Sequence, residues 1–497
     1  MDNILFIPLD ERPCNFEFPQ KLINSTEGFK LLIPPKEILG KKKTPSNFAL
    51  LKNFILENAK DAKAAVISID QLLYGGIVPS RLHKKSMKVL NERLNLLKEI
   101  KAINPNIILN CFVLIMRCPN YSSSDEEPDY YETYGETINK IGKLIDLNED
   151  YKSLMNNNEE LINAVVDYEK RRRKNIKQVK NTIRFTKDVI DFLVIPQDDS
   201  QVHGFSSMDR AEVLEFIEEG KYKNIDIYPG ADEVGMTLIA RTINELNGTS
   251  KSFYLDFLHE ESKSVIPAYE NRPLFETIKA HIKASGNKVV ENVNDSDIVL
   301  FLNYDKFEQR ESVDPSVLDT DAALKQISRM KDAKKRGKIV ALADACYVNG
   351  GNIEYMKLLS SKMKIDSLDV YAGWNTSSNT LGTAISFASV LSYYGNEVES
   401  KKFLAERIYD DLIYQAYARR YITKNILPEL GLNCFDVKKG LSKVRSITKK
   451  VLKDYAKENF KSFYSKHHLK SVNMPWKRMF EVSVEVDKWK NYYLYSC

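Results

Sequence analysis

Residues 193–204, LVIPQDDSQVHG, contain the pattern that decides the fold, a short apolar run followed at once by carboxylates and amides. Apolar runs without polar alternation are typical of strands buried on both faces, as in a parallel sheet covered by helices. Polar clusters that follow such strands lie at the carboxyl edge of the sheet, where α/β proteins bind ligands. The pattern recurs in LFIPLDERPCN (5–15), VISIDQLLYGG (66–76), VLIMRCPN (113–120), IDIYPGADEVG (225–235) and DVYAGWNTSSNTLG (369–382).

The first half of the chain alternates such runs with helical stretches, for example 48–59 and 87–103, which have apolar residues at three- and four-residue spacing. This βα alternation indicates a parallel sheet. A long polar, helix-favouring stretch then interrupts it. We therefore predict an α/β domain over residues 1–248, with a helical insertion at about 146–190.

A polar break at 247–250, NGTS, precedes a second series of strands and helices. Its size suits one doubly wound unit, so we predict a flavodoxin-like α/β domain over residues 249–397. Residues 398–497 are expected to form a helical C-terminal region. The predicted fold class is α/β, with two doubly wound parallel-sheet domains. One α/β barrel plus a helical region is the alternative, because strands ending in acids around a ring would give the same pattern.

The composition argues against nucleic acid and membrane partners. The chain has 73 basic and 68 acidic residues, a net charge of only +5, and no apolar run of membrane-spanning length. The basic runs at 170–174 and 438–470 are interpreted as solvated helix faces. Because there is no secretory signal and no CxxC pair, we expect a cytoplasmic protein with reduced thiols. The oligomeric state stays open, and the cysteines are Cys14, Cys111, Cys118, Cys346, Cys434 and Cys497.

Asp198 and Asp199 are the first candidate catalytic residues, because two adjacent carboxylates after a buried strand cannot both point into apolar packing. Tandem acids suit glycosidic bond cleavage. One carboxyl protonates the leaving oxygen, while the other stabilises positive charge at the anomeric centre or orients a substrate acetamido group. The alternative is helix capping, with Asp199 or Ser200 starting the helix that contains residues 208–218.

Asp232 and Glu233 repeat the acidic pair after the next strand. If the two loops are adjacent, an acid from each could face the other across a sugar, and a separation of roughly 5 Å would suit retention. No organic cofactor is needed for this chemistry. Alternatively, the four carboxylates could hold Mg²⁺ or Mn²⁺, which prefer oxygen ligands.

Further polar and aromatic residues follow the predicted strands and are candidates for substrate binding. Alternatives remain for several of them: Arg12 could pair with Asp10, the glycines at 75–76 could form an ordinary turn, and residues 373–382 could be a capped turn with a packing tryptophan. The candidates are Asp10, Arg12, Asn15, Asp70, Tyr74, Arg81, Arg117, Gln197, His203, Trp374, Asn375 and Asn379.

Several chemistries lack their usual marks in this chain. GxGxxG after a strand, GxxxxGK[ST], HExxH and GxSxG are all missing, and only six histidines occur, scattered along the sequence. Nicotinamide binding, P-loop hydrolysis, zincin proteolysis and α/β-hydrolase chemistry are therefore disfavoured.

Five long motifs together resemble a bacterial family, domain of unknown function 4127. The resemblance spans most of the chain, to about residue 386, and implies that the motif loops form one shared site, although it carries no established reaction. The motifs are PLDERPCN (8–15), IDQLLYGGIVPSR (69–81), IPQDDSQVHG (195–204), YPGADEVGMTLIAR (228–241) and YAGWNTSSNTLG (371–382).

The hypothesis that best fits these residues is a glycoside hydrolase-like enzyme that acts on a small polar molecule, expected to be a carbohydrate. The second is a hydrolase or isomerase that depends on Mg²⁺ or Mn²⁺. The third is a non-catalytic protein that binds a small polar ligand.

Overall fold

The computed structural model describes residues 1–311, 318–393 and 395–487, and the chain divides into two compact units. Unit 1 comprises residues 1–11, 29–242 and 269–272, and unit 2 contains the other described residues. The last ten residues of the predicted C-terminal region, Cys497 among them, lie outside the described residues.

Unit 1 is built on an open sheet of six parallel strands. The order β2-β1-β3-β4-β5-β6 is the flavodoxin-like order extended by one strand, with its switch point between β1 and β3. The strands are β1 (Asp2–Ile7), β2 (Phe29–Leu32), β3 (Ala64–Ser68), β4 (Ile108–Phe112), β5 (Phe192–Gln197) and β6 (Ile225–Pro229).

The apolar runs form the centre of this sheet, as the sequence predicted. Every residue of β3 and of β5 is buried, because helices cover both faces of a doubly wound sheet. The connecting helices are α2 (Phe48–Ala59), α3 (Ile69–Leu73), α4 (Ile77–Leu82), α5 (Met87–Leu94), α6 (Leu96–Ile103), α10 (Phe205–Gly220) and α11 (Val234–Leu246).

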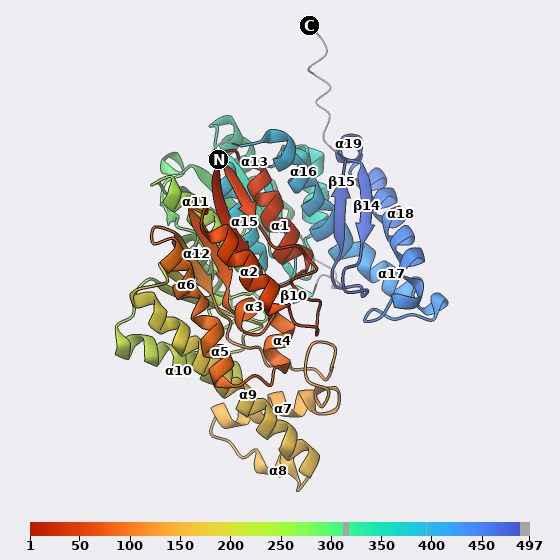
Figure 1. The fold of residues 1–497 in the computed structure, drawn as a ribbon. Coiled ribbons are helices and arrows are strands. Elements are labelled where there is room, and N and C mark those ends of the chain that lie inside the picture. Colours follow the sequence, from red (N-terminus) through yellow and green to blue (C-terminus); the bar gives the residue numbers. More distant parts are fainter. Residues whose placement is uncertain (312–317, 394, 488–497) are drawn as a thin grey trace. The chain divides into compact units, whose positions relative to one another are not determined.

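A helical group lies between β4 and β5 and comprises α7 (Tyr131–Asp146), α8 (Lys152–Met155) and α9 (Glu159–Arg184) (Figure 1). It begins at residue 131, earlier than the 146 expected from the sequence. The group has an apolar core of its own, in which Tyr131, Tyr168 and Phe205 pack together. This core also takes in residues from the segment that follows β4, so it fixes the path of the chain toward the carboxyl edge of the sheet.

Unit 2 contains a second open parallel sheet, of five strands. Its order β8-β7-β9-β11-β13 is also flavodoxin-like, which confirms the predicted α/β class. Helix α12 packs with α15 and α13 with α14, so two helix layers accompany the sheet. The strands are β7 (Ser252–Phe257), β8 (Lys288–Val289), β9 (Ile298–Asn303), β11 (Ile339–Asp344) and β13 (Val370–Ala372), and the helices are α12 (Leu274–Ala284), α13 (Thr320–Lys335), α14 (Ile353–Lys362) and α15 (Ser377–Leu391).

The remaining elements of unit 2 are mostly helical, with one addition to the prediction. Strands β14 (Leu469–Asn473) and β15 (Ser483–Val486) form an antiparallel hairpin beside α18 (Figure 1). A π-helix occupies Ile408–Ala418. Two short strands, β10 (Arg310–Glu311) and β12 (Tyr347–Val348), also pair. The other helices are α1 (Pro13–Asn24), α16 (Glu397–Arg407), α17 (Arg419–Asn425), α18 (Leu441–Asn459) and α19 (Lys461–Tyr464).

The barrel alternative is wrong for this chain. Each of the two sheets ends in edge strands, β2 and β6 in unit 1 and β8 and β13 in unit 2, whereas a barrel closes by pairing its first and last strands. The five cysteines within the described ranges are all free thiols. Among those residues no helix has the length and apolar character needed to cross a membrane.

Two adjacent arginines of α9 provide a test of how the insertion is anchored. Arg172 is buried, forms an ion pair with Asp209, and donates to the carbonyl oxygens of Met116 at 2.8 Å and Arg117 at 2.9 Å. Arg173 has 73 % of its side chain exposed and pairs with Glu212. We expect Arg172→Ala to lower the free energy of unfolding by about 3–5 kcal/mol, because it leaves a buried carboxylate uncompensated.

The measurement is urea denaturation, with Arg173→Ala as the control that removes the same group from an exposed pair. The control is expected to change stability by less than about 1 kcal/mol. Equal effects of the two substitutions would contradict the anchoring role of Arg172.

Candidate active site

The candidate site lies in unit 1 at the carboxyl edge of the sheet, where the ends of β3, β4 and β5 are neighbours. Asp70 follows β3, Arg117 follows β4, and the two aspartates follow β5. Pairing between the last two strands continues beyond β4, because Ile115 lies in a parallel bridge with Gln197 and its carbonyl oxygen accepts the backbone N–H of Asp198 at 3.3 Å. This extension brings Arg117 beside the tandem acids.

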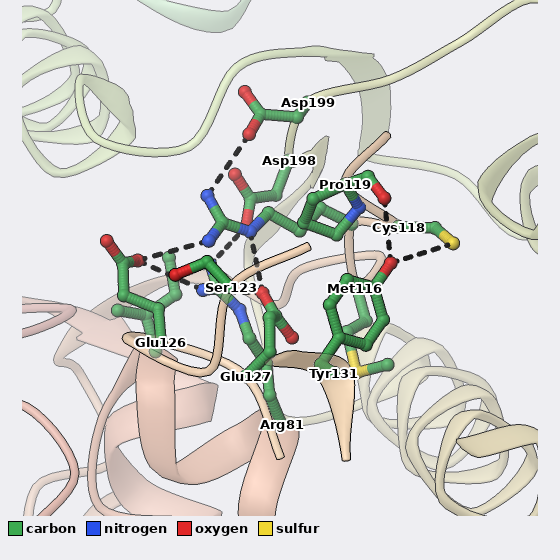
Figure 2. Close-up of polar contacts among 12 residues, drawn as sticks. Arg81, Met116, Cys118, Pro119, Ser123, Glu126, Glu127, Tyr131, Asp198 and Asp199 are labelled. Atoms are coloured by element: carbon green, nitrogen blue, oxygen red, sulfur yellow. Dashed lines mark hydrogen bonds and ion pairs between the residues drawn. The ribbon is translucent and has the colours of Figure 1, made fainter. Parts of the chain in front are cut away.

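Arg81 is the first of two guanidinium groups at the centre of the site (Figure 2). Only 2 % of its side chain is exposed. Its Nη2 donates to Oδ2 of Asp198 at 2.7 Å, and its Nη1 contacts Oε2 of Glu126 at 3.1 Å and Oε1 of Glu127 at 3.2 Å. Arg81 is thus a bridge between the β5 loop and the loop that follows β4.

Arg117 is the second guanidinium and contacts the same two glutamates. Its Nε donates to Oε1 of Glu127 at 2.9 Å and its Nη2 to Oε2 of Glu126 at 3.3 Å. Its Nη1 lies 3.2 Å from Oδ2 of Asp199. Both tandem acids therefore have an arginine partner. Figure 2 shows the two acids and Arg81, with their contacts as dashed lines.

Carboxylates outnumber guanidinium groups in this cluster. Burial, opposed by a hydrogen bond from the Leu114 N–H, raises the pKa of Asp70 to about 7, and the charge of Asp198 adds to the increase. Burial and the same Asp198 charge raise the pKa of Asp199 to about 6, against the lowering effect of Arg117. The site can thus hold exchangeable protons near neutral pH, as general acid–base chemistry requires.

Asp199 has a strained backbone and a partly exposed side chain, as is common for residues that contact a ligand. Its backbone is left-handed, with φ of 40°, a conformation that costs energy in a non-glycine residue and persists when the surroundings impose it. Its side chain is 30 % exposed, against 11 % for Asp198. Helix α10 begins at Phe205 with Gly204 as its N-cap, so the capping alternative for Asp199 and Ser200 is wrong.

The second acidic loop adjoins the first, because Gly230 N–H donates to the carbonyl oxygen of Gln197 at 3.0 Å. Glu233 is completely buried, and its Oε2 accepts the N–H of Ala231 at 3.1 Å. A Cβ on Gly230, whose φ is 129°, would lie 2.1 Å from the Glu233 carboxylate, so the loop is wound around this side chain. Asp232 is also buried.

The other predicted substrate-binding residues of unit 1 are Tyr74, Gln197, His203 and Asp10. Tyr74 is buried against the ring of His83. Burial raises the pKa of Tyr74, and the charge of Asp70 raises it further. Gln197 accepts a hydrogen bond from Asn271 at 2.5 Å, and His203 contacts Asp146 of the helical group at 3.3 Å. Asp10 is buried after β1.

The paired glycines between α3 and α4 have a structural use. Both have positive φ, and a Cβ on Gly75 would lie 2.7 Å from the backbone N of Ser46. The turn therefore packs against residues 45–46 and sets the direction of α4, which carries Arg81.

The predicted residues of unit 2 have local partners. Asn375 donates to Asn379 at 2.7 Å, and Thr376 caps α15. The indole N–H of Trp374 donates to Thr383 at 3.1 Å, which supports the capped-turn alternative for this loop. Arg12 lies over the ring of Trp476 at 4.9 Å, and Asn15 is buried in α1.

Sequence reasoning missed Glu126 and Glu127. They stand in the stretch DEEPDYY (125–131), which follows the polar cluster RCPN by only a few residues and is rich in acids. Glu127 is 1 % exposed and touches both arginines. The acid-rich stretch could have been predicted to contain partners for buried arginines, which need carboxylates. It was not, because these glutamates do not directly follow a predicted strand.

The metal alternative depends on how the acidic side chains are arranged. Within residues 1–311, 318–393 and 395–487, no group of three or more His, Cys, Asp or Glu side chains is arranged to hold a metal ion. The four catalytic candidates therefore do not fit a Mg²⁺ or Mn²⁺ site in this arrangement.

The family model "Protein of unknown function (DUF4127)" matches residues 4–485. The chain belongs to the DUF4127 family. No curated protein matches this DUF4127 chain significantly. The solved structures that are similar include the carboxyl transferase domain of Rhizobium etli pyruvate carboxylase, with and without 3-bromopyruvate, each at 12 % identity and a TM-score of 0.19. Each match covers 92 % of this chain but only 61 % of the other, and a TM-score this low carries no argument about fold or function.

The raised pKa of Asp70 predicts a pH-dependent stability. The native state keeps this proton where the unfolded chain has lost it, so the contribution is complete below about pH 4 and is lost as pH rises through about 7. Asp70→Asn keeps an acceptor for Leu114 but cannot ionise. We expect the stability of the variant relative to wild type to increase by about 2–3 kcal/mol between pH 5 and pH 8.

Urea denaturation at both pH values measures this change. The control is Asp61→Asn, an exposed residue just before β3, whose relative stability should not vary with pH. A constant difference between Asp70→Asn and wild type across this range would contradict the assignment.

Proposed function

We propose that this DUF4127 protein is a carbohydrate-active hydrolase of the glycoside hydrolase type, with Asp199 as the proton donor and Asp198 as its partner. The observation that carries the proposal is the asymmetry of the two adjacent acids. Both acids pair with an arginine, but Asp199 is the more exposed, has the longer contact at 3.2 Å and has a pKa raised to about 6, whereas Asp198 is more buried and lies 2.7 Å from Arg81. Acids in contrasting environments are typical of sites that need one proton donor and one carboxylate.

The chemistry follows from these two states. Asp199 would give its proton to the leaving oxygen while the glycosidic C–O bond breaks. Water would then add to the anomeric carbon and return a proton to the Asp199 carboxylate. The carboxylate of Asp198 would stabilise positive charge at that carbon, or hold a substrate acetamido group that acts as the nucleophile. Glu233 has no catalytic role in this proposal, because its carboxylate accepts the N–H of Ala231 and so stabilises its own loop.

The test is hydrolysis of a panel of aryl glycosides, including 2-acetamido sugars and uronic acids, with and without chelator. We expect turnover that survives chelation and falls at least ~100-fold in Asp199→Asn, the size of effect that follows loss of a general acid. Asp198→Asn should also reduce turnover. Asp188→Asn, an exposed residue that precedes β5, should not affect it.

Three outcomes would oppose the proposal. Chelator-sensitive turnover would favour a metal-dependent hydrolase or isomerase. Binding of a sugar that Asp198→Asn and Asp199→Asn weaken, without turnover, would favour a non-catalytic ligand-binding protein. Silence across the panel, with no binding, would remove simple glycosides as substrates.

The pH dependence of turnover tests the role of Asp199 separately. A donor must be protonated, so kcat/KM should fall as pH rises through about 6. The charge of Glu126 contributes to the raised pKa of Asp199, so Glu126→Gln should move this alkaline limb to lower pH. A limb that stays in place, or moves to higher pH, would show that another group is the donor.

A further inference from the structure

Unit 2 contains a small cavity lined by charged and polar residues. It belongs to a different unit from the acidic site and does not depend on the hydrolase proposal. Its volume is about 140 Å³, and it is lined by Lys364, Asp366, Ser367, Lys401, Lys466 and His467. The first three residues belong to the turn before β13, Lys401 to α16, and the last two follow α19. Three segments distant in sequence thus converge on one basic cavity.

The single carboxylate of this cavity already has a cationic partner. Oδ2 of Asp366 lies 2.7 Å from Nζ of Lys466 and 3.8 Å from Nε2 of His467. Burial alone would raise the pKa of Asp366, but these contacts hold it well below its usual value. Asp366 therefore compensates Lys466, whereas burial lowers the pKa of Lys401 against the opposing charges of Asp369, Asp366 and Glu397.

The other two lysines are held at the cavity in different ways. Nζ of Lys401 donates to the carbonyl oxygens of Asp366 at 2.9 Å and Leu368 at 3.0 Å, which fixes its ammonium group with one N–H to spare. Lys364 is exposed, and its ammonium makes no hydrogen bond or ion pair with any described residue. Nδ1 of His467 is buried and also has no hydrogen-bond partner among the described residues.

Two of the lining residues, Lys466 and His467, belong to a basic stretch of the sequence. Residues 438–470 contain ten lysines and one arginine but only two acids, although the whole chain has a net charge of only +5. Lys466 and His467 stand at the end of this segment. A concentration of positive charge of this kind raises the local concentration of anions.

We propose that this cavity binds a phosphate group, either free inorganic phosphate or the end of a small phosphomonoester. Lysine ammonium groups bind phosphate oxygens as point charges. The volume is enough for one tetrahedral oxyanion together with a few water molecules. Lys364 and Lys401 supply the ammonium groups for this contact.

The test is isothermal titration of the full chain with inorganic phosphate at constant low ionic strength, repeated with glycerol 3-phosphate. We expect Lys364→Gln to weaken phosphate binding roughly tenfold, the loss expected for one charge-assisted hydrogen bond. Lys364 is exposed and holds no buried partner, so this variant should fold. Lys450→Gln, an exposed lysine of α18, is the matched control and should bind within about twofold of wild type.

The outcomes separate the sources of the phosphate. Tighter binding of glycerol 3-phosphate than of phosphate supports a phosphomonoester ligand, and equal binding supports free phosphate. Absence of binding of both probes at ~10 mM, a concentration above any specific affinity expected for such a site, would overturn the proposal. Equal weakening by Lys364→Gln and Lys450→Gln would also overturn it, because diffuse surface charge would then account for the binding.

Discussion

The candidate site depends on two buried guanidinium groups that share carboxylates. A buried arginine without a partner costs several kcal/mol, so Arg81 and Arg117 require acids close by. Glu127 meets this requirement for both, since one of its oxygens contacts each arginine. The irregular segment after Arg117 must therefore follow a path that returns Glu127 to the sheet edge, and the orientation of both arginines toward Asp198 and Asp199 follows from this.

The same kind of motif has different consequences in neighbouring loops. The acids after β5 face two arginines, and the carboxyl of Asp199, whose backbone is strained, is partly exposed. In the loop after β6, Glu233 folds back onto the N–H of Ala231, and Gly230 makes room for it. Tandem acids after a buried strand thus indicate a polar edge, whereas the backbone conformation decides whether a carboxyl is presented or used internally.

The two units have the same sheet architecture, but unit 1 has an acidic cluster and unit 2 has a basic cavity. Both sheets have flavodoxin-like strand order, with polar residues at the carboxyl ends of the strands. In unit 1 these residues form a cluster with an excess of carboxyl groups, in which burial favours bound protons. The basic cavity of unit 2 instead lies among a turn, a helix and the segment after α19. Site chemistry therefore follows from local partners and not from the fold.

The sequence by itself determined the fold class, because continuous apolar runs followed by polar clusters leave few alternatives to helix-covered parallel sheets. It also identified four of the six residues in the central ion cluster, since each stands in or near a loop after a strand. Tertiary structure decided what the sequence left open: two open sheets and not a barrel, Gly204 and not Asp199 as the cap of α10, and the recruitment of Glu126 and Glu127. The physical reason is that strand burial is a local property of the chain, whereas the partner of a buried charge depends on which distant segment the packing brings within hydrogen-bonding distance.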